Sequence, residues 1–412
     1  MGCCASAPGS PGGESAVARA RREARGVAIP HFNRSGVTDA CVLSDPSGSA
    51  ARLFAGLDAR RGANAYVSDP YRGEPIARWH AHDKPVSRVA WLPRARKLLT
   101  ASRDGTCALW SDPQQIPDDD LLRPGGGGFA PALATYRAGD LPVTGLCAVE
   151  ERGVFVTASR DYSVKVWDLE ASTSVVSSPS SASRVSRNVA THLRRVPGEP
   201  LVVQTSEDLR VRVFDLRVPL HEAAAVQTLE SGHGDIPKCV DVAEDGVTVL
   251  VGANGFERGA GCELRVFDRR ALSRSSSDPG SSGGNLTCSV REMRGHEAAV
   301  NGVAFVPGVR GAGGGAIAVS ASTDRTVRVW DCGRGDEIGA APLRFDGYEK
   351  SPGDAGAVTC VAAAPPEVGG EGGPGAFVAG EYGGKTQAWR IVDGGTGETV
   401  SEAWTEGEAP EE

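Results

Sequence analysis

The first six residues, MGCCAS, are of the types that lipid-transferring enzymes modify. Gly2 followed by Ser6 matches the N-myristoylation pattern, in which Met1 is removed and the new amine of Gly2 is acylated. Cys3 and Cys4 would then be within reach of a membrane-bound palmitoyl transferase. Because one myristoyl chain gives only marginal membrane binding, a second acyl chain makes attachment stable. The sequence therefore predicts lipidation at Gly2, Cys3 and Cys4, with inert cysteines after an accidental Met-Gly start as the alternative.

A basic run follows this motif at Arg19, Arg21, Arg22 and Arg25. A basic side chain held near an anionic membrane contributes roughly 1 kcal/mol to attachment, and salt weakens this attraction. Glutamates crowd the other end of the chain, within residues 402–412. We therefore expect an N-terminal arm over 1–26 that meets the cytoplasmic face of a membrane, and an acidic tail over 406–412.

Two other motifs could do chemistry, but each lacks part of its context. GGKT at 383–386 is similar to the end of a phosphate-binding loop, yet Ala379 stands where glycine is expected and the surroundings are strand-turn-strand. His80 and His82 could supply two metal ligands, and no third ligand is in view. No catalytic set is recognisable by spacing. We expect no enzyme, cofactor, metal or small-molecule substrate; a hydrolase whose ionisable groups converge only in the fold is the alternative.

Composition narrows the class of protein further. The chain has 412 residues, 40% of them hydrophobic. No apolar run approaches the ~20 residues of a membrane-spanning helix. The start also lacks the apolar core of a secretory signal, which places the ten cysteines in the reducing cytoplasm. A net charge of −8 argues against nucleic acid as a partner.

A repeat runs through the chain and must position any site. "LLTASRDGTCALWSD" at 98–112 returns as "VFVTASRDYSVKVWD" at 154–168, "LVVQTSEDLRVRVFD" at 201–215 and "IAVSASTDRTVRVWD" at 317–331. In each copy an aspartate precedes an aromatic residue by six positions, and apolar residues alternate between them. This pattern predicts two strands joined by a tight turn. Weaker copies end at 262–268 and 385–391, and a degraded copy over 37–69 makes seven.

Upstream of the best copies lie Gly295-His296, Gly232-His233 and Ala81-His82. The combined pattern resembles the WD-repeat family, whose four-stranded blades form β-propellers. The resemblance implies an all-β chain with one seven-bladed propeller over 27–405, closed by either 27–32 or 398–404. A single blade cannot bury both faces, so blades stack until the ring closes. The third strand of successive blades should carry Trp110, Trp167, Phe214, Phe267, Trp330 and Trp389.

The same resemblance implies a buried hydrogen-bond network of structural role within a blade. In the best copy it would join His296, Asp324 and Trp330 through Ser320 or Ser322. Across the blades, the residues expected to take part are His82, Asp104, Trp110, Asp161, Trp167, Asp208, His296, Asp324 and Trp330.

The surface offers the remaining candidates. The position between serine and aspartate in the repeat is predicted to lie in a turn at one rim of the propeller, and it holds Arg103, Arg160, Glu207 and Thr323. Arginine is enriched in interaction hot spots, so Arg103 and Arg160 are candidate protein-binding residues. The alternative is that both are simply soluble turn residues.

Two stretches depart from the generic repeat, at 183–217 with "VSRNVATHL" and at 252–270 with "GANGFERGAGCELRVFDRR". They resemble a ciliary branch of the WD-repeat proteins. That resemblance implies a non-enzymatic protein of the cilium and basal body that acts in membrane and intraflagellar traffic with GTPase-activating partners. We therefore expect a membrane-tethered scaffold that binds other proteins through its propeller rim.

A second function class remains open. "FDLR" at 214–217 and "FDRR" at 267–270 resemble the WD-x-R box by which some propellers dock a ubiquitin-ligase adaptor, with phenylalanine in place of tryptophan. Arg217 and Arg270 would carry that contact. On this alternative the chain is the substrate receptor of a cullin-type ligase, and an exposed arginine after a strand is the simpler interpretation.

Overall fold

The structure of the chain is a computed structural model. The structure describes residues 36–43, 52–58, 63–68, 75–113, 132–170, 175–176, 181–183, 188–219, 225–230, 234–255, 260–271, 285–311, 314–338, 343, 356–364, 376–394 and 398–403. The described part contains β-strands and a short 3-10 helix, Glu150–Arg152. It contains no helix with the length and apolar character needed to cross a bilayer.

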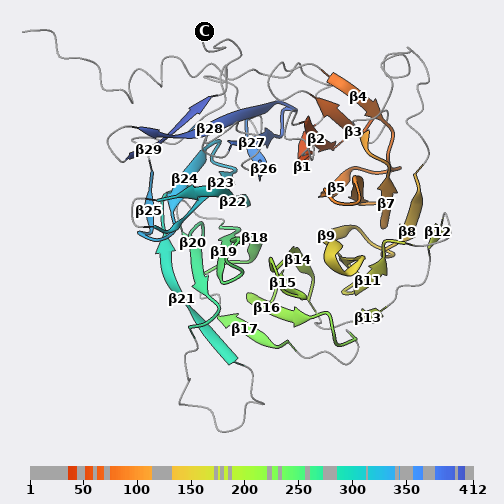
Figure 1. Ribbon diagram of the computed structural model, residues 1–412, viewed down its shortest axis with the longest axis horizontal. Helices are drawn as coiled ribbons and strands as arrows, with labels where there is room; N and C mark the ends of the chain where they lie inside the picture. The colour runs from red at the N-terminus through yellow and green to blue at the C-terminus, as the bar shows by residue number, and fades with distance from the viewer. Residues whose placement is uncertain are drawn as a thin grey trace, which may run out of the picture.

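The strands form seven blades arranged in a ring (Figure 1). Blade 1 holds β1 Val37–Leu43, β2 Arg52–Leu57, β3 Ala65–Ser68 and β4 Pro75–Trp79. Blade 2 holds β5 Val86–Leu92, β6 Lys97–Ser102, β7 Thr106–Trp110 and β8 Ala134–Arg137. Blade 3 holds β9 Val143–Val149, β10 Val154–Ser159, β11 Val164–Asp168 and β13 Ser181–Ser183. Blade 4 holds β14 Ala190–Arg195, β15 Leu201–Ser206, β16 Arg210–Asp215 and β17 Gln227–Glu230.

Blade 5 holds β18 Pro237–Val242, β19 Thr248–Ala253, β20 Leu264–Asp268 and β21 Asn285–Met293. Blade 6 holds β22 Val300–Arg310, β23 Ala316–Ser322, β24 Val327–Asp331 and β25 Asp336–Glu337. Blade 7 holds β26 Val358–Ala363, β27 Ala376–Glu381, β28 Thr386–Gly394 and β29 Glu398–Ala403. The predicted all-β seven-bladed propeller is therefore confirmed. The third strand of each of blades 2 to 7 carries its expected aromatic residue: Trp110, Trp167, Phe214, Phe267, Trp330 and Trp389.

The outer edges depart from a simple repeat. Blade 1 extends to Trp79, ten residues past the degraded copy at 37–69. β12, Val175–Val176, pairs in parallel with β8 of blade 2. The first part of β21 pairs in parallel with β17, which joins blades 4 and 5 into one eight-stranded sheet. These additions cover edges that would otherwise present unpaired backbone groups.

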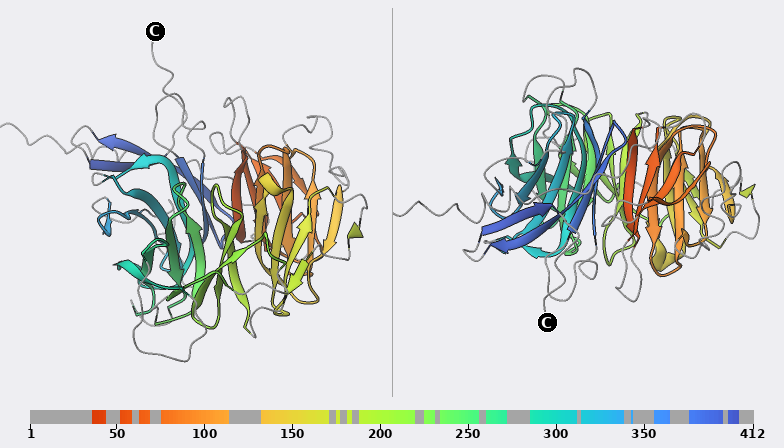
Figure 2. Two further views of the ribbon diagram at one scale, coloured as in Figure 1. Left: turned by 60° about the horizontal axis from the view of Figure 1, so that its bottom comes forward. Right: turned by 90° about the horizontal axis from the view of Figure 1, so that it is seen from above.

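The hydrophobic core is divided among the junctions between blades. Each of its seven clusters takes residues from two neighbouring blades, for example Trp79 of blade 1 with Trp110 of blade 2. The rings of these two tryptophans lie 5.7 Å apart in an edge-on arrangement. Figure 2 shows that neighbouring blades stand face to face. Because each four-stranded sheet has two apolar faces, only the neighbouring blades can cover them.

A β-bulge recurs near the start of the first strand in all seven blades. The bulged residues are Thr38, Ser87, Thr144, Thr191, Lys238, Asn301 and Thr359. At five junctions this side chain donates a hydrogen bond of 2.6–2.7 Å to the carbonyl that begins the first strand of the next blade. We call these contacts the inter-blade clasps.

The ring closes between blades 7 and 1. The hydroxyl of Thr359 donates to the carbonyl of Val37 at 2.6 Å, across 322 residues of sequence. All four strands of each of these blades come from one continuous segment, and β29 is the outer strand of blade 7. Of the two segments considered for closure, 398–404 thus contributes the last strand, and 27–32 lies outside the described residues.

Candidate functional site

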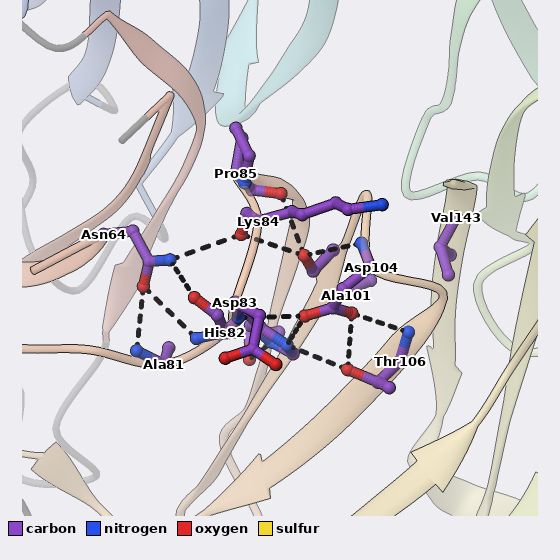
Figure 3. Close-up of polar contacts among 12 residues, drawn as sticks. Asn64, Ala81, His82, Asp83, Lys84, Pro85, Ala101, Asp104, Thr106 and Val143 are labelled. Atoms are coloured by element: carbon purple, nitrogen blue, oxygen red, sulfur yellow. Dashed lines mark hydrogen bonds and ion pairs between the residues drawn. The ribbon is translucent and has the colours of Figure 1, made fainter. Parts of the chain in front are cut away.

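The blade 2 network connects its lead-in segment to its third strand (Figure 3). His82 Nε2 lies 2.8 Å from the hydroxyl of Thr100, which also accepts a hydrogen bond from Trp110 Nε1 at 2.9 Å. On the other side of the ring, His82 Nδ1 lies 3.0 Å from Thr106 Oγ1 and 3.3 Å from Asp104. The predicted set of His82, Asp104 and Trp110 is therefore brought together, and every partner is local to the blade.

Blade 6 repeats this arrangement and settles which serine takes part. His296 lies 2.8 Å from Asp324 Oδ2 and 2.7 Å from the hydroxyl of Ser320. Trp330 Nε1 donates to the same Ser320 hydroxyl at 2.8 Å. Ser322 instead donates to the backbone carbonyl of Ala298.

These hydrogen bonds stabilise the charged form of the two aspartates. Burial on its own raises the pKa of Asp104, but the bonds from His82 and Thr106 outweigh it and lower the pKa to about 2. The pKa of Asp324 is held still lower, because hydrogen bonding to His296 and Thr326 again exceeds the effect of burial. Both carboxylates are thus ionised at neutral pH, where they accept hydrogen bonds within the turn and cannot act as general acids.

Blade 3 forms only parts of the network. A Cβ at Gly139, the position of His82 in blade 2, would lie 2.4 Å from the hydroxyl of Ser159, so no histidine fits. Trp167 still donates to Thr157, while Asp161 bonds Ser163 and the backbone N–H of Asp140. Asp161 and Trp167 therefore belong to two separate groups.

In blade 4, Asp208 is likewise not joined to the aromatic residue of its third strand. It pairs with Arg212, which lies four residues later in the chain. The expected full network is wrong for Asp208, because Gln204 and Phe214 replace the hydroxyl and the indole that relay the hydrogen bonds in blades 2 and 6.

Sequence reasoning missed Asn64, which is fully buried just before β3. Its amide nitrogen donates to the carbonyl of His82 at 2.6 Å, and its amide oxygen accepts from the N–H of Ala81 at 2.8 Å (Figure 3). Asn64 thereby fixes the segment that places His82. It belongs to blade 1, and no repeat copy in the sequence marks it.

The turn residues between the second and third strands form a ring on one face. Their backbone N–H groups each donate to an equivalent carbonyl just before a first strand, and the seven residues are Asp58, Arg103, Arg160, Glu207, Asn254, Thr323 and Tyr382. All except Asn254 line one cavity of about 790 Å³. Arg103 and Arg160 thus lie at the rim of one opening of the propeller, which we call the channel mouth.

Charges at the channel mouth link neighbouring blades. Arg103 lies 3.8 Å from Asp58 of blade 1, and Arg160 lies 3.5 Å from Glu207 of blade 4. All four side chains are partly exposed, so each pair contributes at most about 1 kcal/mol. These residues can be rearranged by a partner at little cost.

Large apolar side chains stand beside these charges on blades 3 and 4. Leu141, Tyr162 and Leu209 are 49%, 47% and 42% exposed. Tyr162 and Leu209 also adopt φ values of 69° and 63°, at the turn position where blades 2 and 7 carry glycine. A side chain in this left-handed region costs roughly 1 kcal/mol. Two adjacent blades therefore accept strain at a position that exposes a large apolar group.

The other two candidate arginines lie on the opposite face, because they follow the third strand of their blades instead of preceding it. Arg217 holds Asp215 with Nη2 to Oδ2 at 2.6 Å, and Arg270 holds Asp268 in the same way at 3.3 Å. Both side chains are largely exposed. The four candidate arginines thus form two separate pairs.

The remaining motifs supply no further site in the described part of the chain. GGKT forms the tight turn between β27 and β28, in the strand-turn-strand context expected. Among the described residues, no group of three His, Cys, Asp or Glu side chains could hold a metal. Gly2, Cys3, Cys4 and the arginines at 19, 21, 22 and 25 lie outside the described residues.

Comparisons with known proteins agree with this geometry. The family described as "WD domain, G-beta repeat" matches residues 73–111, 132–168 and 287–331, which span most of blades 2, 3 and 6. Denticleless protein homolog of Danio rerio is 30% identical over 98 residues, covering 24% of this chain and 13% of that protein. WD repeat-containing protein 37 of Xenopus laevis is 27% identical over 205 residues, covering 48% and 36%.

Nuclear distribution protein PAC1 of Komagataella phaffii is 25% identical over 189 residues, covering 44% of this chain and 35% of that protein. The chain thus spans between about an eighth and about a third of the length of these relatives. Repeats of this kind typically build non-enzymatic scaffolds. Together with the seven blades and the networks of blades 2 and 6, the matches show that this chain carries WD40 repeats and is built as a seven-bladed β-propeller.

Proposed function

We propose that this protein is a scaffold that docks a protein partner on the face of the channel mouth. The observation that carries the proposal is the group of exposed Leu141, Tyr162 and Leu209 beside Arg160, at turns that accept backbone strain. Tyrosine and arginine are enriched in interaction hot spots, and neighbouring apolar contacts such as the two leucines exclude water from them. Strain kept at such a position suggests selection for contact over stability.

The test replaces Tyr162 and Leu209 together by glycine, which relieves the left-handed backbone and removes both apolar groups. We expect a melting temperature equal to or above that of the unmodified protein, with loss of the proteins captured by proximity labelling. Val218→Ser is the matched control, since Val218 is similarly exposed but follows β16 on the opposite face. An unchanged set of labelled proteins in the glycine variant would refute this docking face.

The cellular setting is part of the same proposal. Residues 183–217 and 252–270 resemble WD repeat-containing protein 31, which supports a role in ciliary traffic with GTPase-activating partners. The MGCCAS start and the four following arginines support tethering to the cytoplasmic face of a membrane at the cilium and basal body.

Membrane tethering is tested by Gly2→Ala with fractionation and imaging in a ciliated cell. We expect this change to abolish both acylations, because palmitoyl transferases meet the chain only after myristate brings it to a membrane. Cys3→Ser with Cys4→Ser should leave weak, fast-exchanging binding. A Gly2→Ala protein that stays in the membrane fraction and at the ciliary base as strongly as wild type would refute the anchor.

A second candidate function uses the opposite face. Arg217 and Arg270 are exposed in the same sequence context on adjacent blades, each oriented by the aspartate two residues before it. This geometry favours paired contact with one adaptor surface of a cullin-type ubiquitin ligase. Pull-down of the ligase adaptor by wild type, and its loss with Arg217→Ala and Arg270→Ala, would support this role over the first.

A further inference from the structure

Lys238 interrupts the ring of bulged residues. The other six positions hold a hydroxyl or a carboxamide, and five of them make inter-blade clasps. Lys238 instead extends toward blade 6, where its Nζ donates to Asn301 Oδ1 at 2.6 Å. A half-buried cation therefore takes the place of a small neutral group. Because Lys238 departs from the hydroxyl or carboxamide found at the other bulged positions, we expect it to have a role other than joining blades.

Arg88 approaches the same region from blade 2. Its Nη2 reaches the carbonyl of Thr191 in blade 4 at 3.4 Å, and its Nη1 bonds the carbonyl of Ser87. Arg88 and Lys238 both line the channel mouth. Within the described part of the chain, neither has a carboxylate at ion-pair distance, unlike Arg103 and Arg160 at the outer rim.

The two cations also act on each other. Burial lowers the pKa of Lys238, and the positive charge of Arg88 lowers it further. On the blade 1 side, the positive charge of Arg88 lowers the pKa of Asp39 against the larger raising effect of burial, and Asp39 already accepts the backbone N–H groups of Ala40 and Val89. Thr38 lines the mouth as well, and its hydroxyl has no hydrogen-bond partner among the described residues. The acidic residues that line the mouth, Asp58 and Glu207, are paired with Arg103 and Arg160, so in the described residues Arg88 and Lys238 keep two positive charges without an ion-pair partner.

We propose that the channel mouth is an anion site in which Arg88 and Lys238 bind the phosphate monoester of a phosphorylated protein segment. Such a group carries about −1.5 to −2 charges at pH 7 and three acceptor oxygens, which match the two cations and their free donors. A single carboxylate would neutralise only one of them. The inference rests on the proposed docking face, because the segment that carries the phosphate lies across that face.

The site itself is tested with inorganic phosphate, titrated calorimetrically against the full-length protein at constant ionic strength in chloride. We expect saturable binding that weakens about tenfold or more in Arg88→Gln and in Lys238→Thr. Threonine is chosen because blades 1, 3, 4 and 7 carry it at this position, so the fold should be kept. Arg94→Gln is the control, since Arg94 is an exposed arginine on the opposite face.

Phosphate also stabilises proteins generally by exclusion from their surface. Equal responses in wild type, Lys238→Thr and Arg94→Gln would therefore be that general salt effect and would overturn the proposal. A second arm compares an immobilised phosphoserine peptide library with its unphosphorylated counterpart. If wild type retains only the phosphorylated library and Lys238→Thr does not, the inference is supported. If inorganic phosphate binds but no phosphopeptide is retained, the site binds free phosphate, and the proposal of a phosphorylated protein segment is overturned.

These results separate the two proposals. If the docking face is wrong but the anion site exists, Tyr162→Gly with Leu209→Gly will leave both phosphate binding and the labelled partners unchanged. If the anion site is wrong but the docking face exists, the glycine variant will lose its partners while phosphate fails to bind wild type.

Discussion

The contribution of an aspartate to the stability of this fold depends on the hydrogen bonds that its carboxylate accepts. Asp324 accepts hydrogen bonds from His296, from Thr326 and from the backbone N–H of Glu297, and so joins the lead-in segment of blade 6 to its turn. Asp83 is at the other extreme, with a side chain that is 96% exposed.

Asp324→Ala should lower the free energy of unfolding by about 1–3 kcal/mol, because the buried side chain of His296 and the backbone N–H of Thr326 would lose their charged acceptor. Urea unfolding followed by tryptophan fluorescence measures the change. Asp83→Ala serves as the control and should stay within about 0.5 kcal/mol of wild type. Equal midpoints for the two variants would mean that the network is not stabilising.

In Glu381, unlike Asp324, the fold disfavours the charged form of the carboxyl group. It is fully buried at the position where blades 2, 3, 4 and 6 carry serine. Burial raises its pKa from 4.5 to about 7, against the lowering effect of the nearby Lys385 charge. The folded protein therefore holds a proton that the unfolded chain has already released, between pH 4.5 and about pH 7.

Stability should consequently fall as the pH rises through this window, by up to about 1.4 kcal/mol per pH unit, and level off above pH 7. Glu381→Ser should remove this contribution and be more stable than wild type above pH 7, with little difference near pH 4.5. Denaturant unfolding at several pH values compares the two proteins. Parallel pH profiles for the two would show that Glu381 does not titrate in this way.

At the level of strands, the side chain at the recurring bulge forms a hydrogen bond that connects one blade to the next. It turns the second residue of each first strand toward its neighbour, so that one side chain can satisfy a carbonyl there. Thr359 does this at the closing junction and also donates to the carbonyl of Gly380 in its own blade.

Thr359→Val keeps the shape of the side chain but removes this donor, so the two carbonyls lose a partner. We expect a loss of about 1 kcal/mol in the free energy of unfolding. Thr135→Val is the matched control, because Thr135 also lies on a strand, β8 of blade 2, but does not take part in an inter-blade clasp. A loss in the control as large as that in Thr359→Val would show that the clasp adds nothing beyond side-chain packing.

For the molecule as a whole, stability depends on closure, because the core lies only between blades. Blade 7 covers blade 6 through the cluster that includes Phe377 and Trp389, and covers blade 1 through the cluster that includes Cys360 and Val378. Each blade thus contributes residues to two hydrophobic clusters, one with each of its neighbours.

Truncation after residue 338 should therefore abolish cooperative unfolding of the entire propeller, because two of the seven clusters would be exposed and the ring could not close. Near-UV circular dichroism and size-exclusion chromatography would report the loss. Truncation after residue 403 keeps β29 and should unfold like the full chain. A shorter chain that retained a sharp transition would show that six blades suffice.

The sequence by itself determined the number of blades and the strand that holds each aromatic residue, and its resemblance to the WD-repeat family implied the His82 and His296 networks. These features depend on alternation and on spacings of a few residues, which any strand-turn-strand unit must satisfy. Even there, Asp161 and Asp208 lacked the full network, because Gly139 leaves no room for histidine and Phe214 has no N–H to donate. The lipidated start stays a prediction.

Only the tertiary structure decided which side chains meet across blades. The clasp between Thr359 and Val37 joins residues 322 positions apart, and Asn64 acts on a segment of the next blade. The same holds for Arg88 and Lys238, which no motif connects and which come together only at the channel mouth. The physical reason is that a local pattern fixes the face of the strand to which a side chain points, whereas closure of the ring fixes what that side chain contacts.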